Sequence, residues 1–276
     1  MIARIVAQKV SESWPYPMVV ENRPGASGGI GVEIAAKAAP DGYTIVIPST
    51  SHIVNQLVSQ VRYDLVRDFA PVSLSGSLPY VLAVPSSVPV KSVDELVAYA
   101  KSRPGKLNYG AMQGSVQHLM GEMLKLERGV DIVMIPYKSS TYAGADVIAG
   151  RVEIWFANMA AALPQAKAGK VRILGYSGDK RSPLLPDVPT MAEAGLPAFN
   201  INASFFILAP AGTPEPIVNA LNREIVKAIA AKDARDRFAA AGVDPASSTP
   251  EELGALIKSE LARWGKVIKS ANVKLD

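Results

Sequence analysis

Short runs of apolar residues alternate along the chain with longer stretches in which apolar residues recur every three or four positions. The short runs predict β-strands, and the longer stretches predict helices. We expect strands at Met18–Val20, Tyr43–Ile47, Val72–Leu74, Tyr80–Val84, Leu107–Tyr109, Ile132–Ile135, Val152–Phe156, Val171–Leu174 and Phe205–Leu208. The stretch from Pro214 to Ala271 is almost wholly helical in pattern. This alternation is typical of an α/β fold with largely parallel sheets.

Three predicted helix starts carry a capping box. In this motif a serine or threonine and a glutamate three residues later bond each other's backbone N–H groups. The pairs are Ser92 with Glu95, Thr190 with Glu193, and Thr249 with Glu252.

The first residues have an amphipathic pattern, because Ile2, Ile5, Val6 and Val10 fall on one face of a helix. A secretory signal needs an unbroken apolar core after a basic start, and charged residues interrupt this stretch. We therefore expect no export signal in the printed chain. A long uncharged stretch, Leu196–Pro214, contains three prolines and is a poor membrane-spanning helix, so the protein is expected not to span a membrane.

The amino-acid composition excludes several classes of function. The 276 residues hold no cysteine, which excludes disulfide scaffolds, thiolate catalysis and cysteine-bound zinc. His52 and His118 do not form a metal-binding motif, and we expect neither a metal nor a cofactor. Lysine and arginine number 29 against 25 acidic residues, a balance too even for a nucleic-acid-binding surface.

The loops that leave the predicted strands differ from the loops that enter them. Ligands of open α/β sheets bind at the carboxyl ends of the strands, where the leaving loops lie. The leaving loops hold hydroxyl, amide and glycine residues with a single charge, Lys138, and they are Pro48–His52, Gly110–Ser115, Pro136–Thr141 and Ala157–Met159. Their lack of carboxylates removes the usual acid–base pairs, whereas neutral donors at helix N-termini suit an anion such as a carboxylate.

Each of these residues also has a purely structural interpretation. Ser115 and Thr141 are candidate N-caps of the helices that follow them, and most serines at helix starts are caps. His52 and His118 are explained as well by buried hydrogen bonding as by ligand contact. Only the occurrence of four such loops on one side favours a binding function.

A glycine-rich segment from Val19 to Gly31 runs from a strand through a loop into a helix, as a dinucleotide site does. Its spacing is wrong, because Val32 and Glu33 follow Gly31 where a third small residue should fall. We therefore do not predict nucleotide binding.

Seven motifs, taken in order, resemble one protein family. They are Glu21–Gly31, Ala39–Thr44, Asp68–Val72, Gly114–Glu122, Pro136–Lys138, Lys180–Pro183 with Pro186–Thr190, and Ala209–Pro214. Together they are similar to the substrate-binding proteins of tripartite tricarboxylate transporters, also called the Bug family. The resemblance runs from residue 1 to the C-terminus.

The resemblance implies a two-lobed fold like that of type II periplasmic binding proteins, each lobe a mostly parallel sheet flanked by helices. Residues 1–105 and 201–276 would form lobe 1, and residues 106–200 an inserted lobe 2. The implied function is capture of a di- or tricarboxylate, or a related carboxylate, in the periplasm for delivery to the membrane permease subunits. Such a protein would be a monomer and not an enzyme.

The same resemblance places the ligand-binding residues in both lobes. By motif they are Ser49, Thr50, Ser51, Gln113, Gly114, Ser115, Tyr137, Ser139, Ser140 and Asn158. The family holds a carboxylate through backbone amides, hydroxyls and ordered waters. This chain departs from the family pattern at Ser139, where glycine is usual, and at Ala157, where many members have aspartate.

Family members begin with an apolar strand and a glycine-rich loop before the helix that opens this chain. We therefore expect a chain truncated at its N-terminus, with the first strand of lobe 1 missing and the edges of its neighbours exposed. Three alternatives stay open: a ligand-sensing partner of a signalling receptor, a truncated member with impaired binding, and, last, a small-molecule enzyme.

Overall fold

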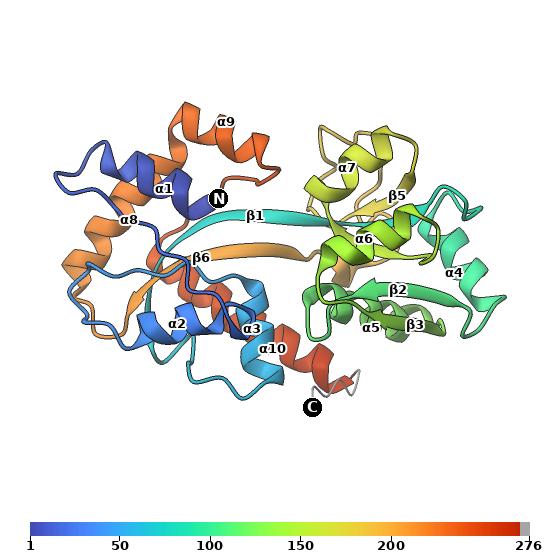
Figure 1. Ribbon diagram of the computed structural model, residues 1–276, viewed down its shortest axis with the longest axis horizontal. Helices are drawn as coiled ribbons and strands as arrows, with labels where there is room; N and C mark the ends of the chain where they lie inside the picture. Colours follow the sequence, from blue (N-terminus) through green and yellow to red (C-terminus); the bar gives the residue numbers. More distant parts are fainter. Residues whose placement is uncertain (271–276) are drawn as a thin grey trace. The chain divides into compact units, whose positions relative to one another are not determined.

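A computed structural model of the chain describes residues 1–270 (Figure 1). The chain divides into two compact units. Unit 1 comprises residues 1–77 and 203–266, and unit 2 comprises residues 78–202 and the chain from 267 onward. The predicted lobes differ from these units mainly in placing residues 78–105 in lobe 1, and they stay a prediction. Ala271, the predicted end of the last helix, lies outside the described residues.

Unit 1 is mainly helical. Its helices are α1 (Ile2–Ser11), α2 (Gly29–Ala36), α3 (Thr50–Val58), α8 (Glu215–Ala230), α9 (Lys232–Ala240) and most of α10 (Pro250–Ser270), with a short 3-10 turn at Ala26–Gly28. The long strands β1 (Phe69–Pro85) and β6 (Asn202–Pro210) pair with each other. The predicted amphipathic helix at the start is confirmed, because α1 packs against α8 and α9 and buries Ile2, Ile5, Val6 and Val10.

Two strands predicted for unit 1 do not form. Met18–Val20 has no regular structure, and Tyr43–Ile47 makes only an isolated antiparallel bridge from Val46 to Leu208 of β6. Both predictions are wrong as strands, although the two segments have the apolar composition of strands. A strand is defined by its hydrogen-bonded neighbours, and among residues 1–270 each segment lacks a neighbour on at least one edge.

Unit 2 is an α/β layer structure in which helices and strands alternate along the chain (Figure 1). Its further elements are α4 (Val93–Lys101), β2 (Leu107–Ala111), α5 (Val116–Arg128), β3 (Ile132–Pro136), α6 (Ser140–Ile148), β4 (Trp155–Asn158), α7 (Met159–Lys167), β5 (Val171–Tyr176) and a 3-10 turn at Pro197–Phe199. The predicted α/β class is confirmed.

The strands of unit 2 are parallel except at β1. β2 and β3 pair in parallel, with Ala111 opposite Pro136, and a parallel bridge from Tyr109 to Ile154 joins β4 to β2. β1 runs antiparallel to β4 and β5. The predicted strands at 72–74 and 80–84 merge into β1, because Gly76 at φ +154° keeps the chain extended between them.

Helices α6 and α7 cover one side of the β1–β4–β5 part of the sheet. Buried Trp155 lies at the centre of a cluster with Val147 of α6, Ala162 of α7 and Val81 of β1. Gly144 lets α6 approach closely, because a Cβ atom at this position would overlap the indole ring of Trp155. This packing holds α6 and α7 against the sheet.

Candidate functional site

Three strands of unit 2 are each followed directly by a helix: β2 by α5, β3 by α6 and β4 by α7. Because these strands run in parallel, the three helices begin at the same edge of the sheet. The backbone N–H of Tyr137 donates to the carbonyl of Ala111 at 2.9 Å and ties the ends of β3 and β2 together. The structure therefore gathers at one edge the predicted site residues of unit 2: Gln113, Gly114, Ser115, Tyr137, Ser139, Ser140 and Asn158.

The start of α5 is capped by its own side chains. The hydroxyl of buried Ser115 accepts the backbone N–H of His118 at 3.3 Å. In turn the Nδ1 atom of His118 accepts the backbone N–H of Gly114 at 3.2 Å, and Gly114 adopts φ +71°, which favours glycine. Burial lowers the pKa of His118 and so keeps this nitrogen available as an acceptor. Ser115 and His118 thus act as a cap on the helix.

The start of α6 is different. Ser139 occupies the N-cap position at φ −156°, an extended conformation open to any residue, so the departure from the family's glycine causes no strain. Its side chain makes no capping hydrogen bond. Within residues 1–270, the first-turn N–H groups of Ser140, Thr141 and Tyr142 have no hydrogen-bond partner. These donors lie at the positive end of the helix dipole.

The start of α7 resembles that of α6. Asn158 is the N-cap residue but its side chain does not cap, and the N–H groups of Met159 and Ala160 find no partner in the described part of the chain. The amide oxygen of Asn158 is buried and has no partner among residues 1–270 either. A buried acceptor without a partner costs about 1–3 kcal/mol, so its presence in a folded protein calls for an explanation.

Tyr137 is held by a neighbour that no local sequence pattern indicates. Its hydroxyl donates to Asp146 at 2.6 Å, and Arg151 donates to the other oxygen of the same carboxylate at 2.9 Å. Burial and the bond to Asp146 raise the pKa of Tyr137 to about 12, and the bonds from Tyr137 and Arg151 lower the pKa of Asp146. The carboxylate bonded to Tyr137 therefore stays ionised, and the ion pair with Arg151 compensates its negative charge.

The predicted residues of unit 1 lie at the start of α3. Thr50 is fully buried, and its hydroxyl accepts the backbone N–H of Ser204 at 3.0 Å. The backbone N–H of Ser49 donates to Nδ1 of His52 at 3.0 Å, and burial lowers the pKa of His52. Ser51 is exposed. His52 and His118 thus each accept a backbone N–H at the start of a helix. The spacing Ser-x-x-His, shared by both segments, could have indicated this role.

Two general properties bear on the chemistry of the molecule. Across residues 1–270, no three or more His, Asp or Glu side chains gather as a metal would require. Across the same residues, none of the helices has the length and apolar character needed to cross a membrane.

Comparison with known proteins identifies the family. A family model described as the tripartite tricarboxylate transporter family receptor matches residues 2–273. The chain belongs to this family. Its members are periplasmic solute-binding receptors and not enzymes, which confirms the family and the non-enzymatic role predicted from the sequence.

Individual members of the family are similar over almost the whole chain. BugT of Bordetella pertussis is 37% identical over 279 residues, which cover 100% of this chain and 86% of BugT. Rpa4515 of R. palustris, solved with adipate, is 37% identical with a TM-score of 0.85, covering 99% of this chain and 93% of that one. MatC from Rhodopseudomonas palustris, solved with bound malate, is 30% identical with a TM-score of 0.79, covering 97% and 93%.

Proposed function

We propose that the protein captures a small dicarboxylate or tricarboxylate in the periplasm and delivers it to the membrane subunits of a tripartite tricarboxylate transporter. The observation that carries this proposal is the pair of uncapped helix N-termini at α6 and α7. Ser139 and Asn158 are residue types that usually cap, yet neither side chain caps its helix, and the N–H groups of the first helical residues find no partner among residues 1–270. Such N–H groups, at the positive end of a helix dipole, bind carboxylates.

The two solved relatives support a carboxylate as the ligand, because one holds adipate and the other holds malate. In our proposal the N–H groups of Ser140 and Thr141 bind one set of carboxylate oxygens, and those of Met159 and Ala160 bind another. The hydroxyls of Ser139 and Ser140 add donors. Gln113, Gly114, Ser115 and the ring of Tyr137 line the site, and Ser49, Thr50 and Ser51 of unit 1 are included on the motif match alone.

The buried amide oxygen of Asn158 supports a finer preference. It is an acceptor, so it suits a ligand group that donates, such as a hydroxyl or a protonated acid. A hydroxylated dicarboxylate such as malate would supply this donor, whereas ionised adipate would not. We therefore expect the site to prefer hydroxy acids of the same length over unsubstituted acids.

Calorimetric titration tests the proposal with four ligands. Adipate, malate and citrate present ionised carboxylates, and adipamide has the length of adipate with no charge. We expect at least one acid to bind and adipamide not to bind. Absence of binding by every acid, or equal affinity for adipate and adipamide, would show that the protein is not a carboxylate receptor.

A further inference from the structure

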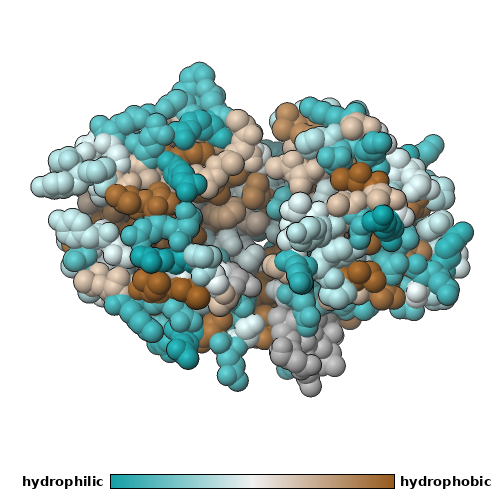
Figure 2. Space-filling view, viewed as in Figure 1, coloured by the Kyte–Doolittle hydropathy of each residue, from teal (hydrophilic) through white to brown (hydrophobic). Residues whose placement is uncertain are grey.

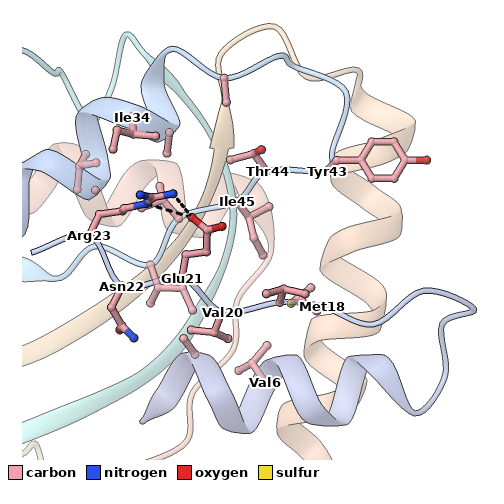
Figure 3. A pocket seen from close by; sticks show the side chains of 18 of the residues that line it. Val6, Met18, Val20, Glu21, Asn22, Arg23, Ile34, Tyr43, Thr44 and Ile45 are labelled. Atoms are coloured by element: carbon pink, nitrogen blue, oxygen red, sulfur yellow. Dashed lines mark hydrogen bonds and ion pairs between the residues drawn. The ribbon is translucent and has the colours of Figure 1, made fainter.

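Two places in the molecule differ in the polar groups that they leave unpaired. One is a groove of about 1000 Å³ in unit 1, beside the segments 18–22 and 43–47. In Figure 2 brown apolar areas lie on the face of unit 1 where Figure 1 shows α1 and α2. Figure 3 shows the two charged side chains of the groove, Glu21 and Arg23, bonded to each other, so neither calls for a further partner. The other place is the end of β4 in unit 2, where a buried polar atom has no partner among residues 1–270.

Tyr80 of β1 lies directly opposite Asn158 of β4 in the antiparallel pair. The backbone of Tyr80 bonds on its other side to Ser177, which follows β5. Its N–H donates to the hydroxyl of Ser177 at 2.7 Å, and its carbonyl accepts the N–H of Ser177 at 2.9 Å. Tyr80 and Asn158 are therefore a pair without backbone bonds between them, the kind in which the Cα atoms lie about 4.5 Å apart and the side chains come closest.

The side chains of this pair lie on one face of the sheet, because successive residues of a strand alternate between faces. Ala157 belongs to the cluster that packs against α6 and α7, whereas the ring of Phe156 stacks on that of Phe199 at 6.1 Å. Asn158, two residues after Phe156, shares its face, and so does Tyr80 across the strand pair. Both therefore lie on the face opposite α6 and α7, at the edge where these helices begin.

Both side chains carry polar groups without partners. Tyr80 is only 3% exposed, and its hydroxyl bonds to none of the described residues. Burial raises the pKa of Tyr80, so the hydroxyl keeps its proton at neutral pH and can donate it. The buried amide oxygen of Asn158 can only accept, and no hydrogen bond joins it to Tyr80. Neighbouring strands thus present one free donor and one free acceptor, and leaving either unpaired is costly.

We propose that Tyr80 and Asn158 together form a subsite for a hydroxyl group of the ligand, in which the phenol of Tyr80 donates to the hydroxyl oxygen and the hydroxyl donates to the amide oxygen of Asn158. This inference rests on the proposed function, and it adds Tyr80 as a residue that determines specificity. It assigns the ligand to the hydroxy acids.

A hydroxyl fits the pair better than the other groups that a small organic acid carries. An ionised carboxylate accepts from Tyr80 but has no proton for Asn158. An ammonium group donates to Asn158 but cannot accept the proton of Tyr80, so amino acids should bind less well. A methylene group leaves both side chains unpaired. A hydroxyl accepts and donates at one oxygen atom, and it therefore pairs both.

Calorimetric titration tests the subsite with closely matched acids. Malate and succinate share one carbon skeleton and differ in a hydroxyl, 2-methylsuccinate replaces the hydroxyl with a methyl group, and aspartate replaces it with an ammonium group. We expect malate to bind about fivefold or more tightly than each of the other three, as loss of a bond to a buried partner requires. Tyr80→Phe removes only the phenolic hydroxyl, and it should reduce this preference to about twofold or less.

Two further variants complete the test. Tyr99→Phe makes the same change on α4, where the ring stacks on Arg103, and it should keep the preference for malate. In the double variant Tyr80→Phe, Asn158→Leu, the preference should fall no further than in either single variant, because one bridging hydroxyl needs both partners. The double variant should also bind 2-methylsuccinate at least as tightly as malate. Urea denaturation of each variant separates loss of binding from loss of folding.

The outcomes distinguish the subsite from the proposed function. If malate, succinate, adipate and citrate all fail to bind, the protein is not a carboxylate receptor and the subsite fails with it. If acids bind but the wild-type protein does not prefer malate over succinate, only the subsite is overturned. The same holds if Tyr80→Phe keeps the preference; an accompanying loss of stability would then assign the pair to an ordered water of the fold.

Discussion

The starts of α5 and α6 occupy equivalent places in unit 2, but their first-turn backbone N–H groups differ in whether the N-cap side chain bonds them. Each helix follows a parallel strand and begins after a serine, Ser115 or Ser139. Ser115 bonds the backbone of its own helix, whereas Ser139 does not. The start of α7 behaves like that of α6. A serine at a helix start therefore does not by itself indicate a ligand site, and the informative feature is the set of N–H groups that the N-cap residue leaves free.

The largest effect is expected from removing one free donor of α6. Ser140→Pro deletes a backbone N–H at the first helical position, where proline is well tolerated, so the helix should still form. Loss of one hydrogen bond to a charged ligand costs about 1.5–3 kcal/mol, or roughly 10- to 100-fold in dicarboxylate affinity by calorimetry.

Two variants control this experiment. Ser140→Ala removes the hydroxyl but keeps the backbone N–H, and it should weaken binding less than the proline does. Lys232→Pro places proline at the first position of α9 in unit 1 and should leave affinity unchanged. Wild-type affinity in Ser140→Pro would contradict a role for the α6 N-terminus.

The next effect separates stability from binding at α7. Asn158→Leu removes a buried acceptor that has no partner among the described residues, so the free energy of unfolding should rise by about 1 kcal/mol. Affinity for malate should fall more than affinity for adipate. Urea denaturation and calorimetry measure the two quantities, and a large loss of stability would show that Asn158 is a structural residue instead.

A smaller effect distinguishes the two serines directly. Ser115→Ala should lower the free energy of unfolding by about 1 kcal/mol, because it removes the bond to the backbone of His118. Ser139→Ala should leave stability almost unchanged and weaken carboxylate binding. Equal losses of stability in the two variants, measured by urea denaturation, would remove the difference on which this comparison rests.

The smallest effect is a dependence of stability on pH. Burial lowers the pKa values of His52 and His118, and both Nδ1 atoms accept a backbone N–H only when unprotonated. The unfolded chain, with histidine pKa values of ~6.5, therefore binds more protons than the folded chain as the pH falls through that value. Stability should decrease from pH 7.5 to pH 5.5, and less so in the double variant His52→Gln, His118→Gln. An identical decrease in both proteins would assign it to other groups.

The fold of unit 2 follows from the sequence better than that of unit 1. β2, β3 and β5 form at the predicted places, and the capping box at Thr249 forms as predicted. At Ser92 only half of the box forms, because the Glu95 side chain accepts the backbone N–H of Lys91 and not that of Ser92. The box at Thr190 also forms its bonds, but it opens a turn and not a helix. The failures at 18–20 and 43–47 have one cause, because apolar composition favours a strand only where a neighbour completes its hydrogen bonds.

The candidate site is predictable from the sequence in its loops but not in its bonding. The uncharged, polar composition of the loops that leave the strands is enough to single out those around Ser115, Ser139 and Asn158. Whether a serine caps its helix depends on backbone and side-chain geometry that residue type does not determine. Two further contacts depend on tertiary packing, and no local sequence spacing predicts them. They join Tyr137 to Asp146 and Thr50 to Ser204.

The central claim is that the free N–H groups of α6 and α7 hold the carboxylate. Amide-resolved NMR during titration with the tightest-binding dicarboxylate observes these groups one by one. The account predicts that the amide signals of Ser140, Thr141, Met159 and Ala160 shift as the acid binds, while that of His118, already bonded to Ser115, moves little. Saturable binding that leaves the first-turn amides of α6 and α7 unmoved would contradict it.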